Sequence, residues 1–170
     1  VYTPDLNYSG TDSFVYEVCD NSAPAACSSA LVSINITAVN DAPSLSNDSY
    51  STTEDTPLNG ASILNNDSDL DGNNLVLNTT PVTAPAHGQL TLNTNGTFTY
   101  LPDLNYFGSD LFVYSVCDNG SPSLCSTASV TLNISATNDA PIALNGNYST
   151  SEDATLNGSS VLTNDSDPDG

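Results

Sequence analysis

One long segment of this chain occurs twice, and this repeat constrains the fold more than any other feature of the sequence. Residues 1–72 match residues 99–170 without an insertion, so each residue lies 98 positions before its counterpart. Of the 72 compared positions, 44 are identical. A unit of this length is the size of a β-sandwich domain and is too long for a solenoid repeat. We therefore predict tandem β-sandwich repeats with a period of 98 residues.

The sequence Asn-Asp-Ala-Pro occurs at residues 40–43 and 138–141 and predicts the boundaries between units. Asn and Asp favour turns, and Pro does not fit a central strand. On this frame, residues 42–139 form one complete immunoglobulin-like repeat, 1–41 are the C-terminal part of one repeat, and 140–170 are the N-terminal part of the next. Neither end piece is expected to bury both faces of its strands. We therefore expect either a slice of a longer array that begins further upstream, or a chain whose ends are completed by neighbouring chains.

Alternation of apolar and polar residues predicts an all-β fold with no helix. Along residues 126–136 every second residue is apolar, from Ala128 to Ile134, which is the pattern of a half-buried strand. A hairpin turn is predicted at Asn95-Gly96, which lies between two alternating stretches. The expected strands are residues 45–53, 61–64, 74–79, 89–93, 97–101, 111–117 and 126–136.

The chain has 20 Asp and Glu residues and no Lys or Arg, which gives a formal net charge of -20. The absence of Lys and Arg excludes nucleic acid as an expected partner and argues against docking on anionic lipid, because both are bound through basic residues. No apolar run approaches the roughly 18 residues of a membrane-spanning helix, and no signal peptide is recognisable. So much uncompensated carboxylate suits a divalent cation, above all Ca²⁺. The alternative is a solvated acidic surface that keeps a secreted protein soluble.

The four cysteines form two pairs with the same spacing, Cys19 with Cys27 and Cys117 with Cys125. Each pair brackets a Pro-containing turn between two predicted strands, so we predict that each forms a disulfide that closes a hairpin. The alternative, a thiolate metal site, requires about four nitrogen or sulfur ligands, whereas each repeat offers two Cys. Disulfides indicate an oxidising compartment.

The strongest chemical signal is the loop that contains Asp67, Asp69, Asp71 and Gly72. Alternating carboxylates followed by Gly resemble the first half of an EF-hand calcium loop, although the twelfth position is Asn78 rather than Glu. Asn, Asp and Gly are also good turn formers. Three Asp residues this close nevertheless repel one another unless a cation lies among them. The other candidate ligands are Asn40, Asp41, Asp5, Asp118, Glu54 and Asp55, together with the second loop and boundary, Asp165, Asp167, Asp169, Asn138, Asp139 and Asp103.

These residues and the strand motifs carry a resemblance to a known family. The stretches Gly88-Gln-Leu-Thr-Leu-Asn93, Asn105-Tyr-Phe-Gly-Ser-Asp110 and Phe112-Val-Tyr-Ser-Val-Cys-Asp118 resemble the tandem-95 or cadherin-like Ig repeats of giant bacterial surface proteins. The form with two cysteines is similar to repeats in Bacteroidetes adhesins, including gliding-motility adhesins exported by the type IX system. The resemblance implies an extracellular array of sandwich domains, used as a stalk or an adhesive fibre.

The resemblance also implies calcium at domain junctions, as in cadherin repeats. By position, the Asn-Asp-Ala-Pro segments are similar to the cadherin linker, Glu54 and its counterpart Glu152 to the strand-A glutamate, and the acidic loops to the DxD motif. Asp103 lies in the segment that is similar to the cadherin LDRE motif. Asp118 is similar to the last aspartate of a cadherin repeat. Ala38, Ala136 and Asn105 depart from that pattern, so one or two ions per junction are expected instead of three.

We therefore predict a structural spacer of a bacterial adhesin or surface filament, stiffened by Ca²⁺ and by disulfides. Its expected partners are neighbouring repeats of the same long chain. The alternatives are a module that binds a glycan or protein ligand directly, and a self-assembling fibre subunit whose partial domains are completed between chains. No catalytic activity is expected, because nothing resembles a nucleophile elbow and His87 is the only histidine.

Overall fold

The computed structural model describes residues 1–169, and all of its regular elements are β-strands. The predicted all-β fold is therefore confirmed. No helix in this part of the chain has the length and apolarity needed to span a membrane. Gly170, the last residue of the second acidic loop, lies outside the described residues. The strands are β1 (Gly10–Cys19), β2 (Cys27–Ile36), β3 (Asp48–Thr53), β4 (Leu58–Gly60), β5 (Val76–Leu77), β6 (Gly88–Leu92), β7 (Phe98–Pro102), β8 (Gly108–Cys117) and β9 (Cys125–Ser135).

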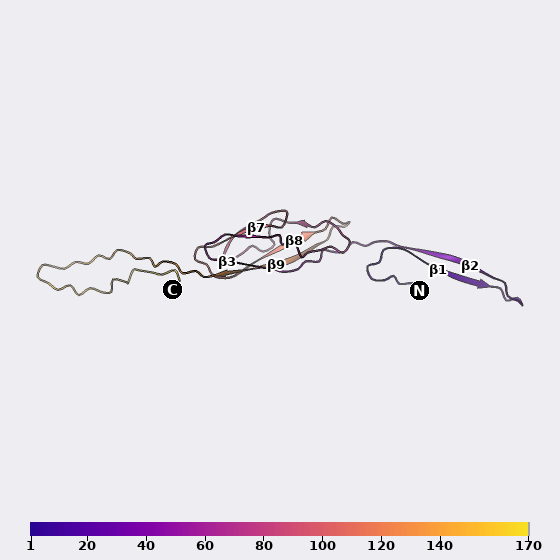
Figure 1. Cartoon of the computed structure of the whole chain (residues 1–170), viewed down its shortest axis with the longest axis horizontal. Helices are drawn as coiled ribbons and strands as arrows, with labels where there is room; N and C mark the ends of the chain where they lie inside the picture. Colours follow the sequence, from indigo (N-terminus) through magenta and orange to yellow (C-terminus); the bar gives the residue numbers. More distant parts are fainter. Residues whose placement is uncertain (170) are drawn as a thin grey trace. The chain divides into compact units, whose positions relative to one another are not determined.

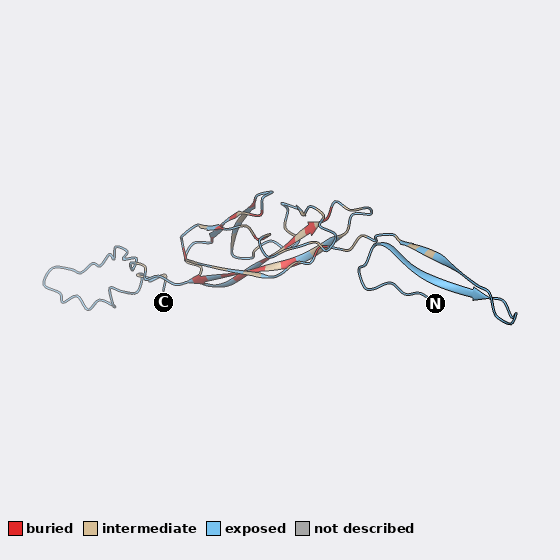
Figure 2. Ribbon diagram, turned by 45° about the vertical axis from the view of Figure 1, so that its right-hand side comes forward, coloured by how far each residue is buried: buried red, intermediate tan, exposed pale blue. Residues whose placement is uncertain are grey.

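The chain forms two compact units, of which the first is Val1–Asp41 and the second begins at Ala42. Unit 1 is an antiparallel hairpin of β1 and β2, in which Gly10 pairs with Ile36. Its apolar side chains are largely exposed, as Figure 2 shows by the pale blue of both strands, and Phe14 is 50% exposed. A two-stranded hairpin has no second layer on which to bury a face.

Unit 2 contains two sheets (Figure 1). One has the strand order β3-β9-β8-β5, and the other has the order β4-β7-β6. All neighbouring strands are antiparallel except β3 and β9, which pair in parallel from Asp48 with Val130 to Thr53 with Ser135. Because parallel strands run in the same direction, the chain leaves β3 and β9 at the same end of the sheet.

The core of unit 2 lies between the two sheets, where Figure 2 shows the buried residues in red. Phe98 from one sheet meets Phe112 from the other in an edge-to-face contact, with ring centroids 5.5 Å apart. Tyr114 is fully buried, and its hydroxyl donates to Asp67 Oδ2 at 3.0 Å. The alternation predicted for the last strand is confirmed, because Ala128, Val130, Leu132 and Ile134 all belong to this core.

The prediction of a strand at residues 61–64 is wrong, because the strand ends at Gly60 and a turn follows. A Cβ atom on Gly60 would lie 2.0 Å from Phe98 Cε1, so only glycine allows this close approach. After Gly60, Ile63 is fully buried. Its N–H donates to Gly96 O in the turn between β6 and β7. Its apolar side chain therefore belongs to a turn. The strand expected at residues 74–79 is limited to Val76–Leu77.

Residues 140–169 contain no named strand and are mostly exposed. They do reproduce one bridge that is found 98 residues earlier in the chain. Ile142 pairs with Ser166, as Ser44 pairs with Ser68 in the preceding repeat. The same backbone bridge is therefore present at both copies of the acidic loop.

Both predicted disulfides are present, and each closes its hairpin at the last strand pair, Cys19 with Cys27 and Cys117 with Cys125. Replacing Cys117 and Cys125 together by Ser is expected to lower the free energy of unfolding of unit 2 by about 2.5 kcal/mol, because the open loop gains entropy when unfolded. Urea denaturation followed by the near-ultraviolet signal of the buried tyrosines measures this. The paired control, Cys19 and Cys27 to Ser, should leave that transition in place. Equal effects of the two pairs would contradict the prediction.

Candidate metal centre

Three carboxylates converge at the end of the four-stranded sheet where β3 and β9 both stop. One oxygen from each of Glu54, Asp139 and Asp169 lies within 4.8 Å of the other two. Glu54 directly follows β3, and its N–H donates to Ser135 O at 3.0 Å, so the parallel pairing continues into the site. Asp139 follows β9 by four residues, and Asp169 comes from the second acidic loop. The fold therefore joins residues that lie far apart in the sequence.

Glu54 is the most buried member of the group, with only 2% of its surface exposed. Its Oε1 accepts hydrogen bonds from the backbone N–H and the hydroxyl of Thr137. Its Oε2 is buried and has no hydrogen-bond partner among the described residues. A buried carboxylate oxygen that is left unpaired is unfavourable. The side chain thus has one oxygen anchored to Thr137 and one buried oxygen without a hydrogen-bond partner in the described chain.

Asp139 shows the same imbalance. Its N–H donates to Asp169 Oδ2 at 2.6 Å, whereas its own Oδ2 is buried without a partner within residues 1–169. Loss of solvent raises the pKa of Asp139, and the negative charges of Asp169, Asp55 and Glu54 raise it further. Asp167 orders the second acidic loop, because its Oδ1 accepts the N–H of Asp169 at 3.0 Å.

This donor set suits a hard divalent cation. All of the converging ligands are carboxylate oxygens, which Ca²⁺ prefers, and the sequence supplies no Lys or Arg to neutralise them. Two unit charges about 4 Å apart repel by about 4 kcal/mol at an effective dielectric constant of about 20. A bound Ca²⁺ would replace this repulsion by attraction and would give partners to Glu54 Oε2 and Asp139 Oδ2. The residues therefore fit the ion that the sequence predicts.

The first acidic loop has one member of the same kind. Asp69 Oδ1 accepts hydrogen bonds from the N–H groups of Asp71 and Asn73, which bend the loop, and Asp69 Oδ2 is buried without a partner in the described chain. Asp67 differs, because both of its oxygens are used. They accept the N–H of Ser46 at 2.9 Å and the hydroxyl of Tyr114 at 3.0 Å. In the second loop Asp165 keeps the first of these bonds, with the N–H of Leu144.

The other predicted ligands have varied positions. Asp118 is 3% exposed, and its Oδ1 accepts the N–H groups of Gly120 and Leu124, so it orders the turn that the disulfide closes. Asp103 is not one of the three converging carboxylates, and its N–H donates to His87 O. The remaining positions are Asn138, whose Nδ2 donates to Asp139 O; Asp5 and Glu152, which are exposed; and Asn40 and Asp41, which are partly buried at the end of unit 1.

Asp55, which is also a predicted ligand, and Asp110, which is not, have hydrogen-bond partners that order the fold. Asp55 has a positive φ of 56°, and its Oδ1 accepts the N–H of Asn105, which also has a positive φ. Asp110 is 6% exposed and accepts four hydrogen bonds, from the N–H groups of Ala86, His87 and Leu111 and from the hydroxyl of Tyr100. Although burial raises its pKa, these bonds together hold the pKa of Asp110 below its usual range.

A two-sheet sandwich with carboxylates gathered at one end belongs to the class of cadherin-like and immunoglobulin-like β-sandwich repeats. The sequence profile of the bacterial cadherin-like domain matches residues 40–136, and the chain belongs to this family. Residues 1–35 match the bacterial Ig domain. The resemblance stated from the sequence is therefore confirmed. No curated protein matches the chain.

Solved structures of cadherins share the fold. The protocadherin gammaB7 EC3-6 cis-dimer structure is 19% identical over 82% of this chain, with a TM-score of 0.54. Mouse cadherin-23 EC22-24 is 17% identical over 75% of the chain, with a TM-score of 0.52. The chain spans 36% and 43% of the length of these two structures. At this level of identity the similarity establishes the fold alone.

Proposed function

We propose that this chain is part of a calcium-stiffened spacer in an extracellular bacterial adhesin or surface filament. The observation that carries the proposal is the group of Glu54, Asp139 and Asp169, with two buried oxygens that lack partners. Glu54 belongs to the repeat proposed to span residues 42–139, and Asp169 to the repeat that follows. A cation held by all three would fasten one repeat to the next and restrict bending at the boundary.

The remaining features support the same proposal. Both disulfides suit an oxidising compartment outside the cytoplasm, and the sequence has no Lys or Arg to bind nucleic acid or anionic lipid. The acidic loop and the boundary recur at the same offset as the strands, so a longer array would place one such site at every junction. The partners of each unit are then its neighbours along the chain.

Calcium is expected to stabilise unit 2 and to lengthen the chain in solution. Saturation of one site at about 100 times its dissociation constant adds about 2.7 kcal/mol to the free energy of unfolding, because the unfolded chain does not assemble the ligands. Thermal denaturation and small-angle X-ray scattering of the full chain, with calcium or with chelator, measure the two effects. Magnesium at matched ionic strength is the control, since it accepts an all-carboxylate cage poorly. Identical melting temperatures and dimensions in calcium and chelator would refute the proposal.

A further inference from the structure

The first and last strands of unit 2, β3 and β9, lie side by side, and their direction determines how the unit responds to tension. The parallel pairing runs from Asp48 opposite Val130 to Thr53 opposite Ser135. The chain enters β3 at Asp48 and leaves β9 at Ser135. Because the two strands are parallel, these two points lie at opposite ends of the pair. Tension along the chain therefore pulls one strand lengthwise past the other.

This direction of pulling loads all hydrogen bonds of the pair at the same time. The bonds of a parallel pair are evenly spaced along both strands, so they share the load and have to break together. A load that acts at one end of a pair instead breaks its bonds one after another, and each bond then carries the whole load in turn. The arrangement of β3 and β9 is therefore the more resistant of the two.

Contacts outside the strand bounds lengthen the pair at both ends. Before β3, Asn47 Oδ1 accepts the N–H of Ser129 at 3.0 Å. After β3, the N–H of Glu54 donates to Ser135 O at 3.0 Å. The bonded contact between the two segments thus extends past the six residue pairs of the strands themselves.

Both strands are also anchored to the rest of unit 2. β9 is antiparallel to β8 as far as Cys125 opposite Cys117, where the disulfide joins the two strands covalently. β9 therefore cannot slide along β8 while the disulfide is intact, and sliding is confined to its pairing with β3. The ring of Tyr50 anchors β3 to the other sheet by an edge-to-face contact with Phe98, with centroids 4.9 Å apart.

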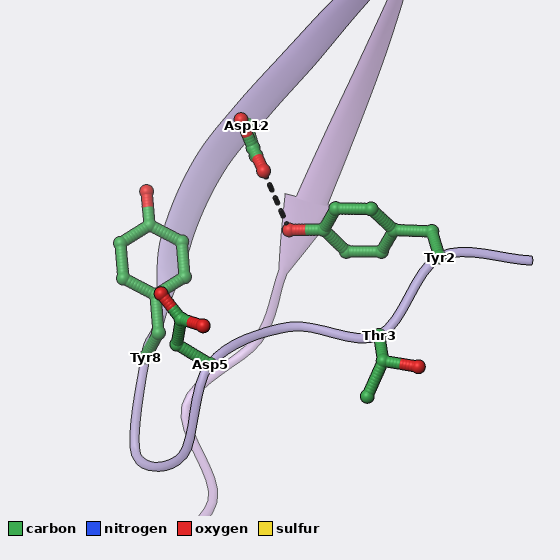
Figure 3. Close-up of a pocket in the computed structure, with 5 residues that line it drawn as sticks. All are labelled: Tyr2, Thr3, Asp5, Tyr8 and Asp12. Carbon is green, nitrogen blue, oxygen red and sulfur yellow. Dashed lines mark hydrogen bonds between the residues drawn. The ribbon is translucent and has the colours of Figure 1, made fainter.

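The β1–β2 hairpin of unit 1 has the less resistant arrangement. Gly10 lies opposite Ile36, so a load that enters β1 at Gly10 and leaves β2 at Ile36 acts at one end of the pair. Figure 3 shows the start of this hairpin, where the Tyr2 hydroxyl donates to Asp12 Oδ2 at 2.7 Å. That bond joins β1 to the segment before it and does not hold β1 to β2.

We propose that the β3–β9 pair is a shear clamp, which keeps unit 2 folded when the chain is pulled along its length. The calcium site acts on bending at the boundary between repeats, whereas the clamp acts on extension and consists of hydrogen bonds between two strands. The inference rests on the proposed spacer function only for the source of the tension. Resistance to pulling is a property of the pair itself.

The test is single-molecule force spectroscopy of the full 170-residue chain in chelator, with the same two strands loaded in two directions. Handles attached through azide-bearing residues in place of Ser44 and Ala136 load the pair in shear, and handles in place of Thr56 and Ala136 load it from one end. All three positions are exposed, and equal urea midpoints of the two chains show that both are folded. At one pulling rate, the unfolding force in shear should be at least about twice the force from one end, because six residue pairs share the load.

A side-chain variant tests the clamp without changing the direction of the load. Asn133→Ala removes the bond from Asn133 Nδ2 to Ser49 Oγ, which spans β9 and β3 at 3.1 Å. It should raise the unfolding rate in shear at constant force about fivefold. Asn59→Ala is the matched control, because it removes the bond from Thr99 Oγ1 that spans β7 and β4, also at 3.1 Å, and it should leave that rate unchanged.

Two results would overturn the clamp. One is an equal unfolding force in the two directions of loading, and the other is an equal effect of Asn133→Ala and Asn59→Ala on the rate in shear. Neither result bears on the calcium proposal, because both measurements are made in chelator. Conversely, identical melting temperatures in calcium and chelator would refute the calcium proposal and leave the clamp in place.

Discussion

Replacing Glu54 by Gln is expected to have opposite effects with and without calcium. In calcium, loss of one charged ligand should weaken cation binding at least tenfold, which removes about 1.4 kcal/mol of stabilisation. In chelator, the variant should be more stable than the parent by about 0.5 kcal/mol or more, because one of three converging negative charges is gone and the amide can donate a hydrogen bond. Denaturant midpoints of unit 2 in the two buffers measure the crossover.

The repeat supplies a matched control for this substitution. Glu152 is the counterpart of Glu54, but it is exposed and has none of the convergent carboxylates around it in the described chain. Glu152→Gln should therefore leave both midpoints unchanged. If Glu54→Gln is destabilising by the same amount in calcium and in chelator, Glu54 acts only through its bonds to Thr137, and the metal centre has to be abandoned.

Local patterns predicted most of the strands, because alternation and turn residues are properties of neighbouring positions. The β6–β7 and β8–β9 hairpins lie where alternation and the glycine turn place them. The parallel pairing of β3 with β9 joins residues about 80 positions apart, and no local pattern specifies it. Ile63 shows a second limit of prediction from local patterns. An apolar residue in a buried turn cannot be distinguished by sequence from an apolar residue in a strand.

The candidate site was also predicted only in part, because its hydrogen bonds depend on residues that are distant in the sequence. Carboxylates that recur at the repeat offset identified the residues around the boundary, but the sequence could not separate ligands from structural anchors. Asp67 and Asp69 lie in one loop, yet hydrogen bonds occupy both oxygens of Asp67 and only one of Asp69. That difference depends on Tyr114 and Ser46, which the fold brings to Asp67.

Asp110 is the clearest omission, although the sequence contained a signal for it. It alternates with Phe112, Tyr114 and Val116 on the inward face of β8, where a carboxylate is unexpected, and Asp12 occupies the same position in the other repeat. A charged residue at an inward position of a strand requires hydrogen-bond donors to balance its burial. The donors come from Ala86 and His87 in a loop, so their identity could not be read from β8 itself.

Asp110→Asn is expected to lower the free energy of unfolding of unit 2 by about 2 to 3 kcal/mol. The carboxylate accepts four hydrogen bonds, whereas an amide offers one acceptor oxygen and places an NH₂ group against donors. Urea denaturation at neutral pH in chelator measures the loss. Asp12→Asn is the matched control, because the same carboxylate is exposed in unit 1, and it should leave the unit 2 transition unchanged.

The same carboxylate should contribute to acid sensitivity. Because hydrogen bonds lower the pKa of Asp110 in the folded state, its stabilisation is fully present above the unfolded pKa of about 3.9 and is lost as pH falls through the lower folded value. The unfolded chain binds the proton first, so stability should fall on acidification. Asn does not titrate, and the difference between parent and Asp110→Asn should therefore shrink below about pH 4. A difference that stays constant from neutral pH to pH 3 would show that the Asp110 carboxylate has the same affinity for protons in both states.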